Sequence, residues 1–233
     1  MSLIPWKKGR ILRLTSRRGK VDISIESVVF YSSMSLQRKL LFSTIFILVL
    51  LCFTFVSVQP ISIAHRERVK KEEITNQIIS FIRNENESLS DHELRTIAEI
   101  VYEESSKKVV DYRLVLAIMK IESNFRQDAV SRKGARGLLQ VKPSLAKYIA
   151  QDVGVHWKDD TTLDEPEKNI KIGVHFFSKL VEDFEGINMA LHAYHVGPTR
   201  LKEIVSEKKK PEKRYLNLVL DEYDRNKSAL PSP

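Results

Sequence analysis

The chain has little cysteine, glycine and proline for its 233 residues. Its single cysteine, Cys52, excludes a disulfide framework and any zinc site built on several cysteines. Eight glycines and eight prolines exclude collagen-like and glycine-rich low-complexity architectures. The remaining composition, 42% hydrophobic and 29% charged, is typical of a globular protein of one or two domains and excludes wholesale disorder.

Acidic residues are scarce at the N-terminus, and this accounts for most of the net charge of +8. Residues 1–39 hold nine Lys or Arg side chains against two acidic ones. Residues 40–90 are balanced in charge, and residues 91–233 carry a net charge of only +1. Nucleic-acid-binding domains concentrate basic side chains on the folded module, so this distribution argues against a nucleic acid partner.

Charged side chains are missing altogether between Leu40 and Ala64. A helix over residues 40–58 would be roughly 28 Å long, close to the roughly 30 Å hydrocarbon core of a bilayer. A chain in lipid must satisfy its backbone groups internally, so this run predicts a transmembrane helix. The basic segment 1–39 before it predicts a cytoplasmic N-terminus and an exported remainder.

A cleaved signal peptide is the alternative interpretation of the same run. The small residues of Ser62-Ile63-Ala64 would allow cleavage after Ala64. The apolar run is longer than the roughly 7–15 residues usual in signal peptides, which favours an uncleaved anchor. Met34 with Arg38 and Lys39 would form an ordinary short basic leader, so we expect translation to start at Met34. Both interpretations export the same domain.

After the membrane segment, helical spacing dominates and strand-like alternation is scarce. Residues 59–90 are mixed in charge and predict a stalk or linker. Ser90 and Glu93 form a capping box that opens a helix. Further helices are expected over 112–122, from Pro166 onward, and over 187–194, 198–205 and 211–223. The pattern predicts a mainly α domain over residues 91–223, followed by a tail over 224–233.

Glu122 is a candidate catalytic acid. It ends the most hydrophobic of the predicted helices, with Ile118 and Val115 one and two turns before it. A carboxyl group in apolar surroundings resists ionisation, which raises its pKa and lets it act as a general acid near neutral pH. Composition by itself favours a simpler interpretation, an exposed glutamate at the end of a helix.

The loop after this helix carries a second candidate site. Gly134 and Gly137 precede the apolar pair Leu138-Leu139 and the amide of Gln140. Glycines let a backbone approach a ligand closely, and the amide of Gln140 offers both a donor and an acceptor. A plain turn leading into a helix is the alternative.

Four short motifs occur in a fixed order, and their sequences are Glu122-Ser123-x-Phe125, Gly137-Leu138-Leu139-Gln140, Asn169-Ile170 and Ala193-Tyr194-x-x-Gly197-Pro198. Together they resemble the catalytic domain of the soluble-type (SLT) lytic transglycosylases, which are related to goose-type lysozyme. The resemblance covers about residues 93–222. It implies a lysozyme-like, mainly α fold that cleaves the β-1,4 bond between N-acetylmuramic acid and N-acetylglucosamine in peptidoglycan and leaves a 1,6-anhydromuramic acid end.

The resemblance also implies roles for individual side chains. It makes Glu122 the single catalytic acid/base and Tyr194 the residue that orients it. It implies substrate contacts from the side chains of Ser123, Gln140, Asn169, Tyr194, His195 and Tyr215.

Three positions depart from the family pattern. Leu139 replaces the usual Met and is nearly isosteric with it. Lys142 replaces a Met before Pro143. His195 replaces the usual Asn, and because histidine titrates near neutrality, this change is expected to alter substrate contacts or the pH response.

Neither a metal nor a cofactor is expected. His192 and His195 are three residues apart, with His175 elsewhere, but no Asp, Glu or Cys ligand pattern accompanies them. The sequence also contains no EF-hand loop.

Two other functions stay open at this stage. A muramidase would add water and usually needs a second acid. A non-catalytic peptidoglycan-binding module of an envelope or secretion assembly would not need a carboxyl group in an apolar site. The expected partners are peptidoglycan glycan strands and, through residues 40–58, the membrane. The expected location is the bacterial inner membrane with the catalytic domain in the periplasm, or secreted if the chain is cleaved after Ala64.

Overall fold

The computed structural model describes residues 11–16, 19–24 and 35–233, and it describes side chains from residue 35 onward except those of 53–62 and 64. The chain divides into two compact units, Met1–Arg66 and Glu67–Pro233. In the first unit, strands β1 (Ile11–Ser16) and β2 (Gly19–Ser24) pair antiparallel, with Ile11 opposite Ser24 and Ser16 opposite Gly19. No strand was predicted in this segment.

Helix α2 (Leu36–Glu85) contains the predicted membrane segment. Its backbone is helical throughout residues 40–58, but the side chains of residues 53–58 lie outside the described ones. Within the described part of the chain, no helix has both the length and the apolar character that crossing a bilayer requires.

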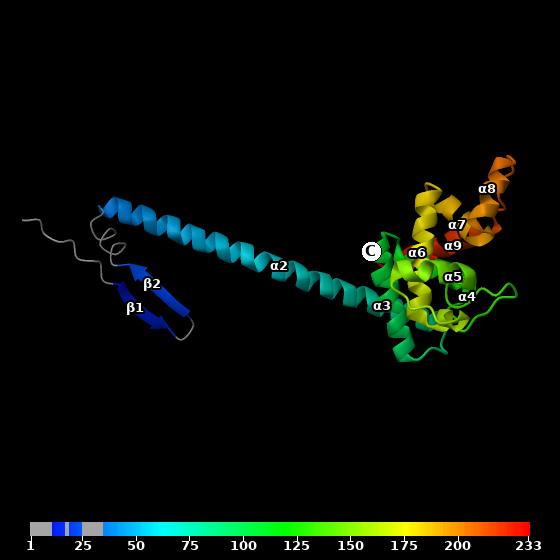
Figure 1. Ribbon diagram of the computed structural model, residues 1–233, viewed down its shortest axis with the longest axis horizontal. Coiled ribbons are helices and arrows are strands. Elements are labelled where there is room, and N and C mark those ends of the chain that lie inside the picture. Colours follow the sequence, from blue (N-terminus) through cyan, green and yellow to red (C-terminus); the bar gives the residue numbers. More distant parts are fainter. Residues whose placement is uncertain (1–10, 17–18, 25–34) are drawn as a thin grey trace, which may run out of the picture. The chain divides into compact units, whose positions relative to one another are not determined.

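The second unit is a bundle of helices (Figure 1). After the end of α2, its elements in chain order are α3 (Asp91–Lys108), α4 (Tyr112–Ser123), α5 (Pro143–Ile149), η1 (Ala150–Val153), η2 (Asp160–Asp164), α6 (Pro166–Asp183), α7 (Ile187–Val196), α8 (Pro198–Ser206) and α9 (Arg214–Ala229). Helix α4 packs against α9, α3 packs against α6, and α6 packs against α7. The prediction of a mainly α domain is confirmed.

Helix α4 forms the centre of this bundle because it is apolar nearly all round. Its residues 114–119 are at most 1% exposed. The side chain of Asp111 caps the start of the helix by accepting from the backbone N–H of Arg113. The helix ends at Asn124, whose left-handed backbone (φ 52°) stops the helical hydrogen bonding. The predicted core helix over 112–122 is thus present.

The second unit extends beyond the predicted domain of 91–223 at both ends. The last turns of α2 place Ile74, Ile78 and Ile82 in the core, each at most 2% exposed, so residues 67–85 are part of the folded unit. At the other end, the Tyr112 hydroxyl donates to the backbone oxygen of Pro231 at 2.6 Å. Both segments gain their order from apolar burial and hydrogen bonds with the bundle.

Candidate active site

A cleft of about 380 Å³ opens at the C-terminal end of α4. Its walls come from α4, the loop before α5, the start of α5, and helices α6 and α7. Val141, Leu145 and Phe176 give it an apolar surface. The predicted site residues that line it are Glu122, Gln140, Tyr194 and His195.

Glu122 lies half-buried in the last turn of α4 and faces this cleft. Its Oε1 accepts a hydrogen bond from the Tyr215 hydroxyl at 2.7 Å. Burial raises the pKa of Glu122 above its ordinary value of 4.5, and the hydrogen bond from Tyr215 lowers it by less. The negative end of the α4 dipole acts in the same direction as burial. The carboxyl group is therefore suited to hold a proton and to give it up.

The chain turns sharply just after Glu122. Asn124 and Phe125 both have left-handed backbone conformations, with φ values of 52° and 58°. Phe125 is fully buried, and its ring meets that of Phe81 edge-on at 6.2 Å. This buried ring fixes the turn, so α4 ends beside the cleft and Glu122 stays at its edge.

The loop facing Glu122 is held by the side chain of Asn169. Asn169 is 0% exposed, and its Oδ1 accepts from the backbone N–H of Leu139 at 2.8 Å. Its Nδ2 donates to the backbone oxygens of Arg136 and Leu163, both at 2.9 Å. These three bonds satisfy the buried amide and join the loop to α6 and η2.

Gly137 allows this close approach. Its φ of +74° favours glycine, and a Cβ atom there would lie 2.2 Å from Nδ2 of Asn169 and 2.3 Å from the backbone oxygen of Leu163. The glycine predicted to approach a ligand thus approaches the protein's own asparagine.

Ser123 supports the same loop from α4. Its side chain is buried, and its Oγ lies 2.8 Å from the backbone oxygen of Leu138 and 3.1 Å from that of Met119. Neither Ser123 nor Asn169 is among the residues that line the cleft. The structure places both behind the loop, so their predicted substrate contacts stay predictions.

Gln140 reaches the cleft from the loop. Its Nε2 donates to the backbone oxygens of Ala129 and Gly137, at 2.9 and 3.0 Å. The amide nitrogen is therefore engaged within the loop, and Oε1 is the atom of this side chain available to accept a hydrogen bond from a ligand.

Tyr194 is not the tyrosine that reaches Glu122. Its hydroxyl donates to the backbone oxygen of Leu139 at 2.6 Å, and its ring packs against Phe176 and Phe177. The hydroxyl bonded to Glu122 is that of Tyr215, so the orienting role predicted for Tyr194 has no hydrogen bond to Glu122 behind it and stays a prediction. Through its bond to Leu139, Tyr194 stabilises the loop.

His195 and Tyr215 form a stacked pair beside Glu122. Their ring centroids are 4.3 Å apart and their planes differ by 12°. Burial lowers the pKa of His195, Glu212 raises it, and Lys133 lowers it, with a net decrease from 6.5. The imidazole is therefore neutral at neutral pH.

An ion pair that was not predicted fixes the outer part of the loop. Arg136 binds Asp164 through two contacts, Nε to Oδ1 at 3.0 Å and one terminal nitrogen to Oδ2 at 2.6 Å. The partners are 28 residues apart and share no motif, so no sequence signal indicated this pair.

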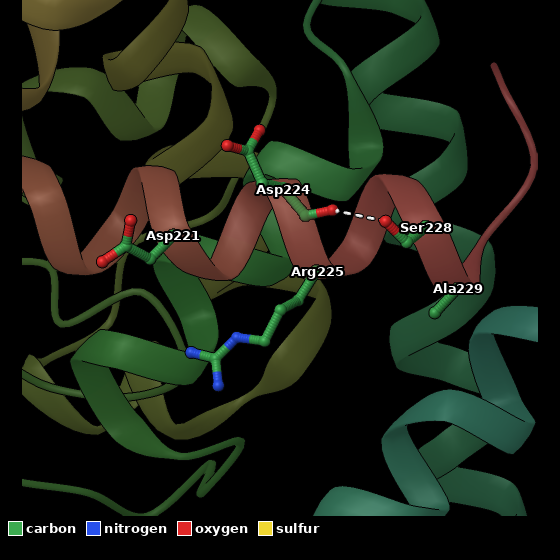
Figure 2. Close-up of a pocket in the computed structure, with 5 residues that line it drawn as sticks. All are labelled: Asp221, Asp224, Arg225, Ser228 and Ala229. Carbon is green, nitrogen blue, oxygen red and sulfur yellow. Dashed lines mark hydrogen bonds between the residues drawn. The ribbon is translucent and has the colours of Figure 1, made fainter.

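A larger hollow of about 590 Å³ lies along one face of α9 (Figure 2). Its lining residues are Asp221, Asp224, Arg225, Ser228 and Ala229, all of them exposed residues of a single helix. Within this set, Ser228 donates only to the backbone oxygen of Asp224 at 3.1 Å. Such an open surface offers no enclosed reactive group, and we assign the active site to the cleft at Glu122.

No group of three or more His, Cys, Asp or Glu side chains in the described residues is arranged to hold a metal ion.

Residues 95–217, more than half of the chain, match the family model described as the transglycosylase SLT domain. The chain therefore belongs to the SLT transglycosylase family. This confirms the resemblance inferred from the four motifs.

The chain is 37% identical over 75 residues to the endo-type membrane-bound lytic murein transglycosylase A of Klebsiella pneumoniae, covering 30% of this chain and 36% of that protein. It is 38% identical over 93 residues to the membrane-bound lytic murein transglycosylase C of Edwardsiella ictaluri, covering 38% and 25%. The crystal structure of the 70 kDa soluble lytic transglycosylase from Escherichia coli is 21% identical, with a TM-score of 0.44 over 56% of this chain and 22% of that one. This chain therefore matches only a minor part of each of these proteins.

Proposed function

We propose that this protein is a peptidoglycan lytic transglycosylase in which Glu122 is the single acid/base. The observation that carries the proposal is the half-buried Glu122, with its raised pKa and the hydroxyl of Tyr215 at 2.7 Å. Membership of the SLT family and the lytic murein transglycosylases among the relatives support it.

Glu122 acts first as an acid in this mechanism. Its proton passes to the glycosidic oxygen between N-acetylmuramic acid and N-acetylglucosamine, and the bond from muramyl C1 to that oxygen breaks. The muramyl N-acetyl group stabilises the charge that develops at C1, as in substrate-assisted glycosidases. Burial keeps the Tyr215 hydroxyl protonated by raising its pKa, so it can stabilise the new Glu122 carboxylate by donating to it.

Glu122 then acts as a base. Its carboxylate takes the proton of the muramyl C6 hydroxyl while the C6 oxygen bonds to C1, which closes the 1,6-anhydro ring. The acid is regenerated and no water is consumed. The nucleophile belongs to the substrate, so this attack has the high effective molarity of an intramolecular reaction.

The carboxylate count favours this mechanism over a hydrolase. Glycosidases that add water canonically use two carboxyl groups that flank the bond. Among the described residues that line the cleft, Glu122 is the one carboxylate. The charge of Glu212 acts on His195, but Glu212 is not part of the lining.

Product analysis tests the reaction. Sacculi digested by the full chain should release muropeptides that end in 1,6-anhydromuramic acid, about 18 Da lighter than hydrolysis products. These ends should resist borohydride reduction and take up no label from heavy-oxygen water. Reducible, labelled muramic acid ends as the main product would show a lysozyme-type hydrolase. Binding to sacculi without any release would show a non-catalytic wall-binding module.

We further propose that residues 40–58 anchor the protein in the bacterial inner membrane, with the catalytic domain in the periplasm. Large apolar side chains are 48–65% exposed around this part of α2, and they are Leu40, Leu41, Phe42, Ile45, Phe46, Ile47, Leu48, Val49, Leu50 and Leu51. Water disfavours such a surface on all sides of a helix, whereas lipid favours it. Cleavage after Ala64 would release the same domain.

A fusion experiment tests this topology. A reporter enzyme that folds only outside the cytoplasm should be active when it is fused after Pro233. The same reporter placed before Leu36 should be inactive, since the basic segment keeps that end inside. Deletion of residues 40–58 should abolish the activity of the C-terminal fusion. An inactive C-terminal fusion in the intact chain would contradict the proposed export.

A further inference from the structure

Three groups from three different helices lie in a row, and the outer two, His195 and Glu122, line the cleft. His195 comes from the last turn of α7, Tyr215 from the first turn of α9, and Glu122 from the last turn of α4. The imidazole stacks on the phenol with centroids 4.3 Å apart, and the phenol donates to the carboxyl at 2.7 Å. His195 therefore contacts the group that contacts the acid.

The stack restricts the direction of the Tyr215 hydroxyl. A phenol O–H prefers the plane of its ring, because the oxygen lone pair is conjugated with the ring. The plane of the ring therefore decides where the proton points. Tyr215 is 8% exposed, and His195 covers one of its faces with a plane only 12° away. Removing the imidazole would let this ring tilt and weaken its alignment with Oε1 of Glu122.

We propose that His195 is a positioning residue that acts on Glu122 through Tyr215, by fixing the plane of the phenol ring. The effect of His195 on catalysis rests on the proposed function. The stack of His195 on Tyr215 and the hydrogen bond from Tyr215 to Glu122 are present without substrate. The role requires a flat ring at position 195 and does not require the imidazole nitrogens.

The charges around the pair are consistent with a geometric role. His195 is faced by Lys133 from the loop, Glu212 from the segment before α9, and His192 one turn earlier on α7. Burial lowers the pKa of both histidines and raises that of Tyr215, so the imidazole of His195 stacks on a neutral phenol and is itself mainly neutral at neutral pH. Glu122 itself is faced by the hydroxyl of Tyr215, and its charge also acts on Tyr194.

The test is a titration of Glu122 by carbon-13 NMR of the full chain labelled at its carboxyl groups, with Glu122→Gln identifying the signal. The hydrogen bond from Tyr215 lowers the pKa of Glu122, so Tyr215→Phe should raise that pKa. His195→Ala should raise it too, by at least half of the Tyr215→Phe shift. His195→Phe should keep it near the wild-type value. The double variant should shift no further than Tyr215→Phe alone, since both changes remove the same bond.

Muropeptide release gives the second measurement. His195→Ala should lower kcat about fivefold with a smaller change in KM, and His195→Phe should restore most of the lost kcat. His195→Asn, which has no ring, takes the place of His195→Ala if circular dichroism shows that the latter is unfolded. If the pKa of Glu122 is unchanged in His195→Ala or His195→Asn, the positioning role is overturned. It is also overturned if His195→Phe shows the same pKa shift and the same loss of kcat as these variants. The expected titrations in a wild-type chain that releases no muropeptides would reject the proposed function and keep the positioning role.

Discussion

Glu122→Gln should lower the release of muropeptides about 1,000-fold while the fold stays intact. Glutamine keeps the size of the side chain and can still accept the hydrogen bond that the Tyr215 hydroxyl donates at 2.7 Å. It cannot give a proton to the glycosidic oxygen or take one from the C6 hydroxyl, so both steps fail. Product chromatography measures the loss, and circular dichroism checks the fold.

Glu87→Gln is the matched control for this variant. It removes the same single charge from an exposed glutamate that does not line the cleft, so turnover should stay at the wild-type level. If Glu122→Gln kept more than about a hundredth of the wild-type turnover, another residue would have to be the acid.

The raised pKa of Glu122 also determines whether this residue makes the fold more or less stable as the pH rises. Between the ordinary pKa of 4.5 and the raised folded value, the folded state binds more protons at this site than the unfolded state does. Glu122 therefore lowers the stability of the wild type as the pH rises through this window. Glu122→Gln removes that slope, so its unfolding temperature relative to the wild type should increase from pH 4 to pH 7.

The apolar surroundings of Glu122 were predictable because they are local in sequence. The helix that carries Glu122 is apolar nearly all round, and such a helix must be buried together with its last turn. The capping box of Ser90 and Glu93 was equally local, and both of its hydrogen bonds are present in the structure. Both features involve residues no more than four positions apart, so they could be predicted without the tertiary fold.

The partners of these residues were not predictable in the same way. Tyr215 lies 93 residues after Glu122, and only the packing of α9 on α4 brings the two together. Of the short helical elements between residues 143 and 164, only a helix after the turn at Gln140 was considered, as an alternative, and no bounds were predicted, because no periodicity can establish itself over one or two turns.

The family motifs by themselves also do not distinguish a side chain that contacts the substrate from one that holds the backbone of the loop. Two of the polar residues they implied as substrate contacts, Ser123 and Asn169, are buried behind the loop and hold its backbone. Burial decides this difference, and burial depends on chain segments far away in sequence. The distinction matters for mutagenesis, because loss of a support residue lowers stability and activity together, whereas loss of a contact residue lowers activity alone.

Asn169→Ala should therefore destabilise the folded unit by about 3 kcal/mol and lower the unfolding temperature by roughly 10 °C. The change removes three hydrogen bonds and takes from the buried backbone N–H of Leu139 and the buried backbone oxygen of Leu163 the partner that Asn169 supplies. The backbone oxygen of Arg136 keeps the hydrogen bond from the backbone N–H of Val141. Calorimetry or denaturant unfolding of the full chain measures the loss. Activity should fall together with the ordering of the loop that carries Gln140.

Asn217→Ala is the control that separates the loss of the buried hydrogen bonds of Asn169 from the loss of an amide side chain in general. Asn217 is exposed on α9, so the same deletion there should change stability by less than about 0.5 kcal/mol. A substrate-binding role for Asn169 predicts a different pattern, in which the unfolding temperature stays near that of Asn217→Ala and KM rises. Three hydrogen bonds on a side chain with no exposed surface favour the first pattern, because both amide protons are already donated within the protein and a sugar cannot reach the buried Oδ1.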